Sequence, residues 1–140
     1  MLSELRAQGR TVWDRFDELH LAHGVHMTAP VTVRFDERAA LDAIVAALDQ
    51  MAPETLGASP VTVAGAIGGG SLPPTPGVEW QSADGSRVLI RPSGTEPKIK
   101  AYLEVVEPPV TSLDDVARSR EVADARLAAL VGEVQGLLSA

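Results

Sequence analysis

The residues best suited to chemistry lie at positions 91–100, whose sequence is RPSGTEPKIK. Lys98 and Lys100 are the only lysines of the chain, although its formal net charge at pH 7 is -7. Glu96 is the single acidic residue among these ten. Positive charge gathered at one place in an otherwise acidic protein indicates an anionic ligand there.

The residue types in this stretch favour a phosphate as that anion. Arg91 offers a planar fork of donors that matches phosphate oxygens, and the hydroxyls of Ser93 and Thr95 add two more donors. Between them, Gly94 can adopt a positive φ, which turns successive N–H groups toward one point. Lys98 raises the local potential. The same residue types are also common in ordinary turns and solvated strand faces, so composition alone leaves a plain turn open.

The elements before this stretch can be predicted from periodicity and capping. Residues 11–23 favour a helix, which begins at a Thr11–Asp14 capping box and ends at Gly24. Alternation over 26–35 predicts a strand, and Asp36 is expected to cap a helix whose apolar stripe runs from Leu41 to Met51. A short strand is predicted at 60–66, and the composition of 68–77 is typical of a loop.

The elements around and after the stretch are clearer. Residues 77–92 read as a β-hairpin with its turn at Asp84-Gly85. The next strand alternates strictly, with Ile99, Ala101, Leu103 and Val105 on one face. A long final helix begins at a capping box formed by Ser112 and Asp115, and its predicted buried stripe consists of Val116, Ala123, Leu127, Leu130, Val134 and Leu137.

This order of elements predicts an α+β fold. We expect an antiparallel or mixed sheet of about four strands with two helices on one face. The helix at 11–23 has no obvious partner in that arrangement. This helix is therefore expected to belong with a part of the protein outside the predicted sheet.

Composition excludes several classes of function. The absence of cysteine removes disulfides and thiolate chemistry. The acidic balance argues against a nucleic-acid partner, although Arg87, Lys98, Lys100 and Tyr102 leave a sheet-based RNA binder as a weak alternative. No apolar run approaches the length of a membrane span, so no membrane partner and a cytoplasmic location are expected. The spacing of His20, His23 and His26 does not favour a metal site, because no further ligand lies nearby in the sequence.

The order of the residues from Arg91 to Pro97 closely resembles the phosphate-binding loop of the α-D-phosphohexomutases, the phosphoglucomutase and phosphomannomutase family. The predicted order of elements resembles the fourth, C-terminal domain of that family. The resemblance implies that residues 1–24 are the C-terminal helix of the preceding domain and the hinge, and that residues 25–140 are the phosphate-binding C-terminal domain. The segments DELHLAHG and KAYLEVVEP are most similar to the branch that contains phosphomannomutases and phosphopentomutase-like enzymes.

The resemblance implies a clamp that grips the phosphate already on the sugar, with Arg91, Ser93, Gly94, Thr95 and Lys98 as its contacts. The family moves phosphate between C6 and C1 of a hexose, such as mannose or glucose phosphate, through a phosphoserine and a bisphosphate intermediate. Its phosphoserine loop, aspartate-rich Mg²⁺ loop and sugar-recognition loop are not matched in this chain. The resemblance therefore implies no catalytic residue and no Mg²⁺ site here, with both in the other domains of a parent enzyme.

Two alternatives to this parent enzyme stay open from the sequence. One is a free-standing sugar-phosphate-binding module without catalysis. The other is a parent of the phosphopentomutase type. Exposure of the apolar stripe of Val12, Phe16 and Leu19 would favour a chain that packs against other domains over a free-standing module.

Overall fold

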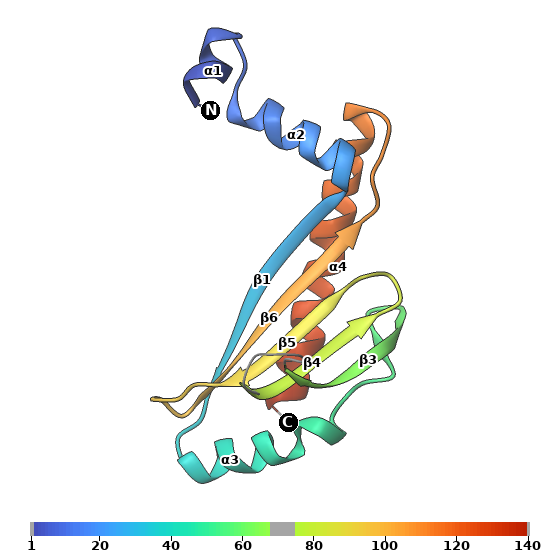
Figure 1. Ribbon diagram of the computed structural model, residues 1–140. Coiled ribbons are helices and arrows are strands. Elements are labelled where there is room, and N and C mark those ends of the chain that lie inside the picture. The colour runs from blue at the N-terminus through green and yellow to red at the C-terminus, as the bar shows by residue number, and fades with distance from the viewer. Residues whose placement is uncertain (1, 68–74, 140) are drawn as a thin grey trace.

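The computed structural model describes residues 2–67 and 75–139, and its elements are labelled in Figure 1. The helices are α1 (Leu2–Ala7), α2 (Val12–His23), α3 (Arg38–Ala47) and α4 (Leu113–Ser139), with a short 3₁₀ turn, η1 (Leu48–Gln50), after α3. The strands are β1 (Val25–Arg34), β2 (Thr55–Leu56), β3 (Ser59–Ile67), β4 (Thr75–Ser82), β5 (Arg87–Pro92) and β6 (Lys98–Glu107). Most of the loop predicted at 68–77 lies outside the described residues.

The strands form one antiparallel sheet in the order β1-β6-β5-β4-β3-β2. The α+β prediction is confirmed, but the sheet has six strands where the sequence predicts about four. β2 was missed because it spans two residues, too few to show any alternation, and it pairs only with the start of β3. The β4–β5 hairpin turns where predicted, with Gly85 at φ +84°.

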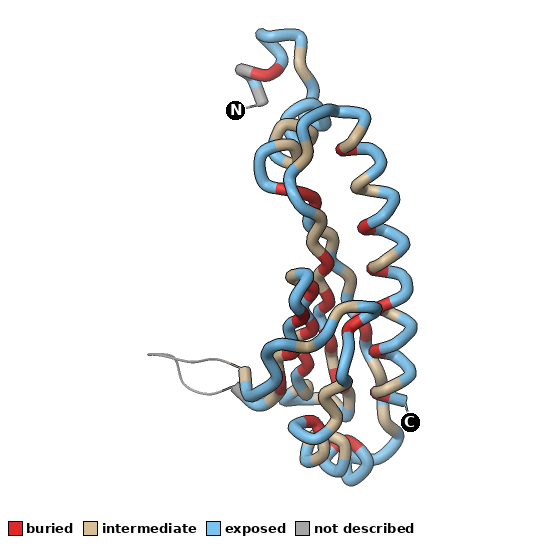
Figure 2. Tube along the Cα trace, turned by 90° about the vertical axis from the view of Figure 1, so that its right-hand side faces the viewer, coloured by how far each residue is buried: buried red, intermediate tan, exposed pale blue. Residues whose placement is uncertain are grey.

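The core lies between the sheet and α4, where the buried residues of Figure 2 are concentrated. Ile99, Ala101, Leu103 and Val105 of β6 are all at most 1% exposed, which confirms the predicted alternation. α4 packs along β1 and β6 with the predicted stripe, except that Leu138, and not Leu137, is its last buried residue. None of the described helices combines the length and hydrophobicity that crossing a membrane requires.

α3 lies across the end of the sheet near the β5–β6 loop, at the bottom of Figure 1. Its Leu41 is fully buried in the same core as the α4 stripe. The predicted cap is wrong: Glu37, not Asp36, occupies the N-cap position, and no side chain caps the helix. The chain stays extended for one residue longer than predicted, so Asp36 lies outside the helix.

α2 stands at the opposite end of the sheet and begins and ends as predicted. Thr11 and Asp14 form the complete capping box, and Gly24 terminates the helix at φ +85°. The helix has no buried residue. Its Val12, Phe16 and Leu19 are 42%, 47% and 37% exposed, so the apolar stripe that the sequence indicates is open to solvent.

Candidate phosphate-binding site

The candidate site is the loop from 93 to 97, which joins β5 to β6 beside α3 (Figure 1). Arg91 pairs with Lys100 across the two strands. Their neighbours Ile90, Ile99 and Ala101 are fully buried on the face toward α4. Because successive strand residues point to opposite faces, Arg91 and Lys100 lie on the other face of the sheet, which we call the open face.

Three backbone hydrogen bonds hold the loop. The N–H of Ser93 donates to the carbonyl of Lys98 at 2.9 Å, and the N–H of Lys98 donates to that of Glu96 at 2.8 Å. The carbonyl of Pro97 accepts from the N–H of Phe35 at 2.8 Å, which ties the loop to the end of β1. Within the described chain, the N–H groups of residues 94–96 have no recorded partner. Consecutive unpaired N–H groups on an anchored loop are donors ready for an anion.

Gly94 does not adopt the positive φ that the sequence predicts. The described glycines with positive φ are Gly9, Gly24, Gly57, Gly77 and Gly85. A Cβ added to Gly94 would meet no atom within 4 Å. Neither the backbone conformation nor packing inside the chain therefore requires glycine at this position, and the space beside it stays open for a ligand.

Glu96 anchors the loop through two ion pairs. Its carboxylate accepts from Lys98 Nζ at 2.6 Å and from Arg34 Nη1 at 3.0 Å. The hydrogen bond from Lys98, followed by that from Arg34, lowers the pKa of Glu96. The Lys98 side chain is only 12% exposed, and its charge is matched by Glu96. This geometry suits Lys98 to bracing the loop more than to direct contact with a phosphate.

Arg91 is held in a different way. Its guanidinium carbon lies 5.6 Å from the centre of the Tyr102 ring, and its Nη2 donates to Tyr102 Oη at 3.3 Å. This hydrogen bond, more than the charge of Lys100, lowers the pKa of Tyr102. No carboxylate pairs with Arg91 among the described residues.

The loop forms one wall of a cavity of about 390 Å³. It is lined by Arg38, Asp42, Val45, Pro76, Arg91, Pro92, Ser93 and Gly94. The structure thus brings Arg91, Ser93 and Gly94 together at one cavity, whereas Thr95 and Lys98 are not among its walls. Arg38, which pairs with Asp42 at 3.1 Å, was missed. No sequence motif indicates Arg38, because it lies far from the loop in the chain. The fold brings it to the cavity by placing the start of α3, just after β1, beside the loop.

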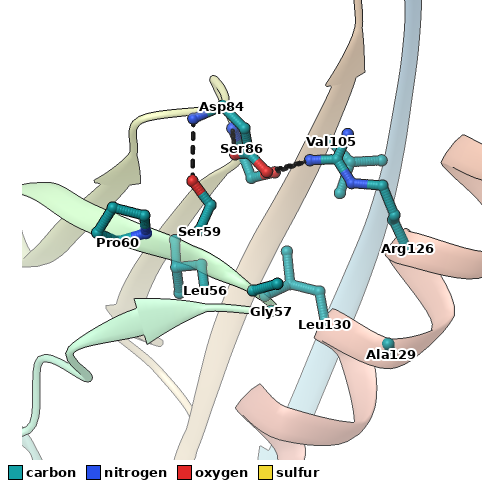
Figure 3. A pocket seen from close by; sticks show the side chains of 11 residues that line it. Leu56, Gly57, Ser59, Pro60, Asp84, Ser86, Val105, Arg126, Ala129 and Leu130 are labelled. Atoms are coloured by element: carbon teal, nitrogen blue, oxygen red, sulfur yellow. Dashed lines mark hydrogen bonds and ion pairs between the residues drawn. The ribbon is translucent and has the colours of Figure 1, made fainter.

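A second pocket, of about 430 Å³, lies between α4 and the β2–β3 region, on the other face of the sheet (Figure 3). Arg126 of α4 reaches across it and is bound by Asp84, Glu107 and Ser86. Because two carboxylates already neutralise this arginine, the arrangement locks α4 to the β4–β5 turn and offers little to an anion.

Mg²⁺ chemistry, which the resemblance places in the parent enzyme, has no counterpart among the described residues. No cluster of three or more His, Asp or Glu side chains in residues 2–67 and 75–139 could hold a metal ion. His20 contacts Arg120, while His26 contacts Glu104 at 3.2 Å. The described histidines therefore lie in separate polar contacts and do not form a metal site.

Comparison with known proteins agrees with the resemblance. Residues 31–116, more than half of the chain, match the model of the phosphoglucomutase/phosphomannomutase C-terminal domain. A probable phosphomannomutase from Haemophilus influenzae is 29% identical over 105 residues, which cover 74% of this chain and 21% of that protein. The chain thus matches only about a fifth of the length of this relative. The chain belongs to the phosphoglucomutase/phosphomannomutase family and contains its C-terminal domain.

Proposed function

We propose that residues 25–140 form a phosphate clamp that grips the phosphate of a hexose phosphate. One observation carries the proposal: three N–H groups without a recorded partner in the described chain, those of residues 94–96, lie on an anchored loop. The loop starts beside Arg91, which pairs with no carboxylate among the described residues. Ser93 and Thr95 supply hydroxyl donors on the same loop, and Lys98 braces it through Glu96. Hydrogen bonds to charged groups contribute about 1.5–3 kcal/mol each, so a few of them suffice for a useful site.

The clamp serves a mutase that moves phosphate between C6 and C1 of mannose or glucose. The phosphoserine, the Mg²⁺ and the sugar-recognition residues belong to other domains of that parent enzyme, in the cytoplasm. The donors at the loop recognise the phosphate and make no demand on the sugar. A clamp of this kind accepts either phosphate of a bisphosphate intermediate, as a reaction with reorientation requires.

Residues 1–24 are proposed to belong to the preceding domain and to the hinge. The exposed stripe of Val12, Phe16 and Leu19 supports packing against another domain and disfavours the free-standing module. Trp13, which is 73% exposed, enlarges this exposed apolar surface. Self-association of the 140-residue chain that disappears in a Phe16→Ser variant would show that this stripe is an adhesive surface. A monomeric wild-type chain that binds no hydrophobic dye would favour the module.

The test of the clamp is a titration of the isotopically labelled chain, followed by amide NMR. Inorganic phosphate, mannose 6-phosphate and glucose 6-phosphate should all shift the amides of residues 94–96, whereas free mannose should not. Arg91→Ala should weaken phosphate binding by about 1.5–3 kcal/mol, because one charged donor pair is lost.

Arg87→Ala is the matched control for this variant. It removes the same charge from the same face of β5, but Arg87 is already paired with Glu79 and Glu104 at 3.5 Å. We expect Arg87→Ala to leave phosphate affinity within about twofold, since exposed pairs contribute little to the local field. Equal effects of the two variants would point to general electrostatic attraction and count against a specific clamp.

A further inference from the structure

Arg91 and Tyr102 are diagonal neighbours on the open face of the sheet. The β5–β6 register pairs Arg91 with Lys100 and Leu89 with Tyr102, so the two side chains lie one pair apart on the same face. The guanidinium therefore rests near the tyrosine ring, at 5.6 Å from its centre, and donates one hydrogen bond to the phenol oxygen.

Apart from Lys100, for which the described residues provide no ion pair, the basic residues around Arg91 are held by carboxylates. Arg34 and Lys98 share Glu96, and Arg87 lies between two glutamates. A carboxylate fixes a cation but also neutralises it, so an approaching phosphate must compete with an anion already in place. Tyr102 is uncharged, and it restrains Arg91 while leaving the full positive charge available.

The contact also leaves most of the guanidinium free. Arginine has five N–H donors, and the structure records only one of them in use, toward Tyr102. An arginine that is already restrained loses less side-chain freedom when it binds a ligand, which favours binding. Resting on the proposed clamp function, we propose that Tyr102 is a positioning residue that presents the Arg91 guanidinium to the substrate phosphate.

Tyr102 can be replaced without disturbing the core. Its side chain is 41% exposed on the open face, whereas its neighbours Ala101 and Leu103 are at most 1% exposed on the other. It is also the single tyrosine of the chain. Its phenol can therefore be titrated by ultraviolet absorbance with no other tyrosine contributing.

The first measurement is the dissociation constant of inorganic phosphate for the 140-residue chain by NMR titration. Tyr102→Leu removes both the ring and the hydroxyl and should weaken binding about two- to fivefold, the range expected for an exposed cation–π contact. Tyr102→Phe keeps the ring and should recover most of that loss. Unchanged or tighter binding in Tyr102→Leu, as expected if the tyrosine sequesters Arg91, would overturn the proposal.

The second measurement is the absorbance titration of Tyr102. In the free chain, Arg91→Ala should raise the pKa of Tyr102, because the hydrogen bond from Arg91 is the main cause of its lowering. Saturating phosphate should also raise the wild-type pKa, since the anion brings negative charge next to the phenol. Sodium chloride at the same ionic strength is the control. A titration curve that phosphate leaves unchanged would mean that the ligand does not bind beside Tyr102.

The variants separate failure of this inference from failure of the clamp. If Arg91→Ala and Tyr102→Leu both bind phosphate as the wild type does, the clamp itself is wrong. If Arg91→Ala weakens binding and Tyr102→Leu does not, the clamp stands and the positioning role of Tyr102 is wrong.

Discussion

Glycines with similar sequence surroundings have different physical roles in this chain. Gly77 has φ +134°, and a Cβ there would lie 2.2 Å from the carbonyl oxygen of Ile90. Gly94 has neither constraint, because its φ is not positive and the space around it is open. The backbone conformation and packing require glycine at position 77, whereas at position 94 glycine leaves open space in the candidate loop.

This contrast predicts opposite results for two alanine substitutions. Gly94→Ala should keep or slightly raise the free energy of unfolding, by up to about 1 kcal/mol, because alanine restricts the unfolded chain. It should nevertheless weaken phosphate binding, since the methyl group enters the open space. Gly77→Ala should lower the free energy of unfolding by about 2 kcal/mol or more through overpacking. Urea unfolding and phosphate titration of both variants test this. A large loss of stability in Gly94→Ala would contradict it.

The ion pairs of Glu96 predict a pH dependence of the loop. The folded-state pKa of Glu96 is lowered, chiefly by Lys98, so its contribution is complete above its ordinary pKa of 4.5. That contribution is lost as the pH falls through the lower folded-state value. In a carboxyl NMR titration, Lys98→Met should raise the pKa of Glu96 more than Arg34→Gln does. Equal, negligible shifts in the two variants would show that neither pair forms in solution.

At the scale of elements, two ionic locks attach helices to the rest of the molecule. Arg126 fixes the middle of α4 to Asp84 and Glu107, while Arg120 near its start binds Asp17 and His20 of α2. α2 contributes no buried side chain. Its attachment to α4 therefore depends on polar contacts, which are weaker than the packing that holds α4 to the sheet.

Removing the second lock should release α2 alone. Arg120→Ala should increase the amide hydrogen exchange of residues 12–23, while the exchange of β6 and the global free energy of unfolding change little. Arg118→Ala is the matched control, because Arg118 lies on the same helix but pairs only with Asp115, at 3.2 Å. If both variants leave α2 equally protected, Arg120 does not hold this helix in place.

Local signals in the sequence predicted much of the fold. The capping box of α2, the alternation of β6 and the β4–β5 turn depend on residues close together in the chain, and all are present. The predicted box of α4 is present in part: Ser112 Oγ accepts from the N–H of Asp115, but the Asp115 carboxylate is recorded with the Ser112 hydroxyl and not with its N–H. β2 was missed, and the predicted cap of α3 was wrong. In both cases tertiary pairing decides where the segment begins.

The order of the residues from Arg91 to Pro97 indicated the candidate site. The contact of Tyr102 with Arg91 and the position of Arg38 at the cavity could not be predicted in this way, because they depend on contacts between distant segments.

At the scale of the whole molecule, the two faces of the sheet carry different kinds of side chain. The face toward α4 carries the apolar core, including the fully buried Trp80 and Ile90. The open face carries Arg91, Lys100 and Tyr102. Stability and the proposed phosphate recognition therefore depend on different side chains.

This separation predicts that a core substitution lowers stability without changing affinity. Leu130 is 2% exposed on α4, so Leu130→Ala should lower the free energy of unfolding by about 2–5 kcal/mol. The dissociation constant of phosphate, measured at a temperature where the variant is fully folded, should stay within about twofold of the wild-type value. Calorimetric unfolding and NMR titration of the same sample provide both numbers. A marked loss of affinity would mean that the core shapes the loop.

The ten-residue pairing of β1 with β6 has a mechanical consequence. The pairing begins at Val25 and Glu107, next to Gly24. It runs without interruption to Arg34 and Lys98, next to the candidate loop at 93–97. At about 3.3 Å per residue this ribbon is roughly 30 Å long, and its many hydrogen bonds make it stiff. If the proposed hinge lies at Gly24, a rotation of about 10° there would move the candidate loop through about 5 Å.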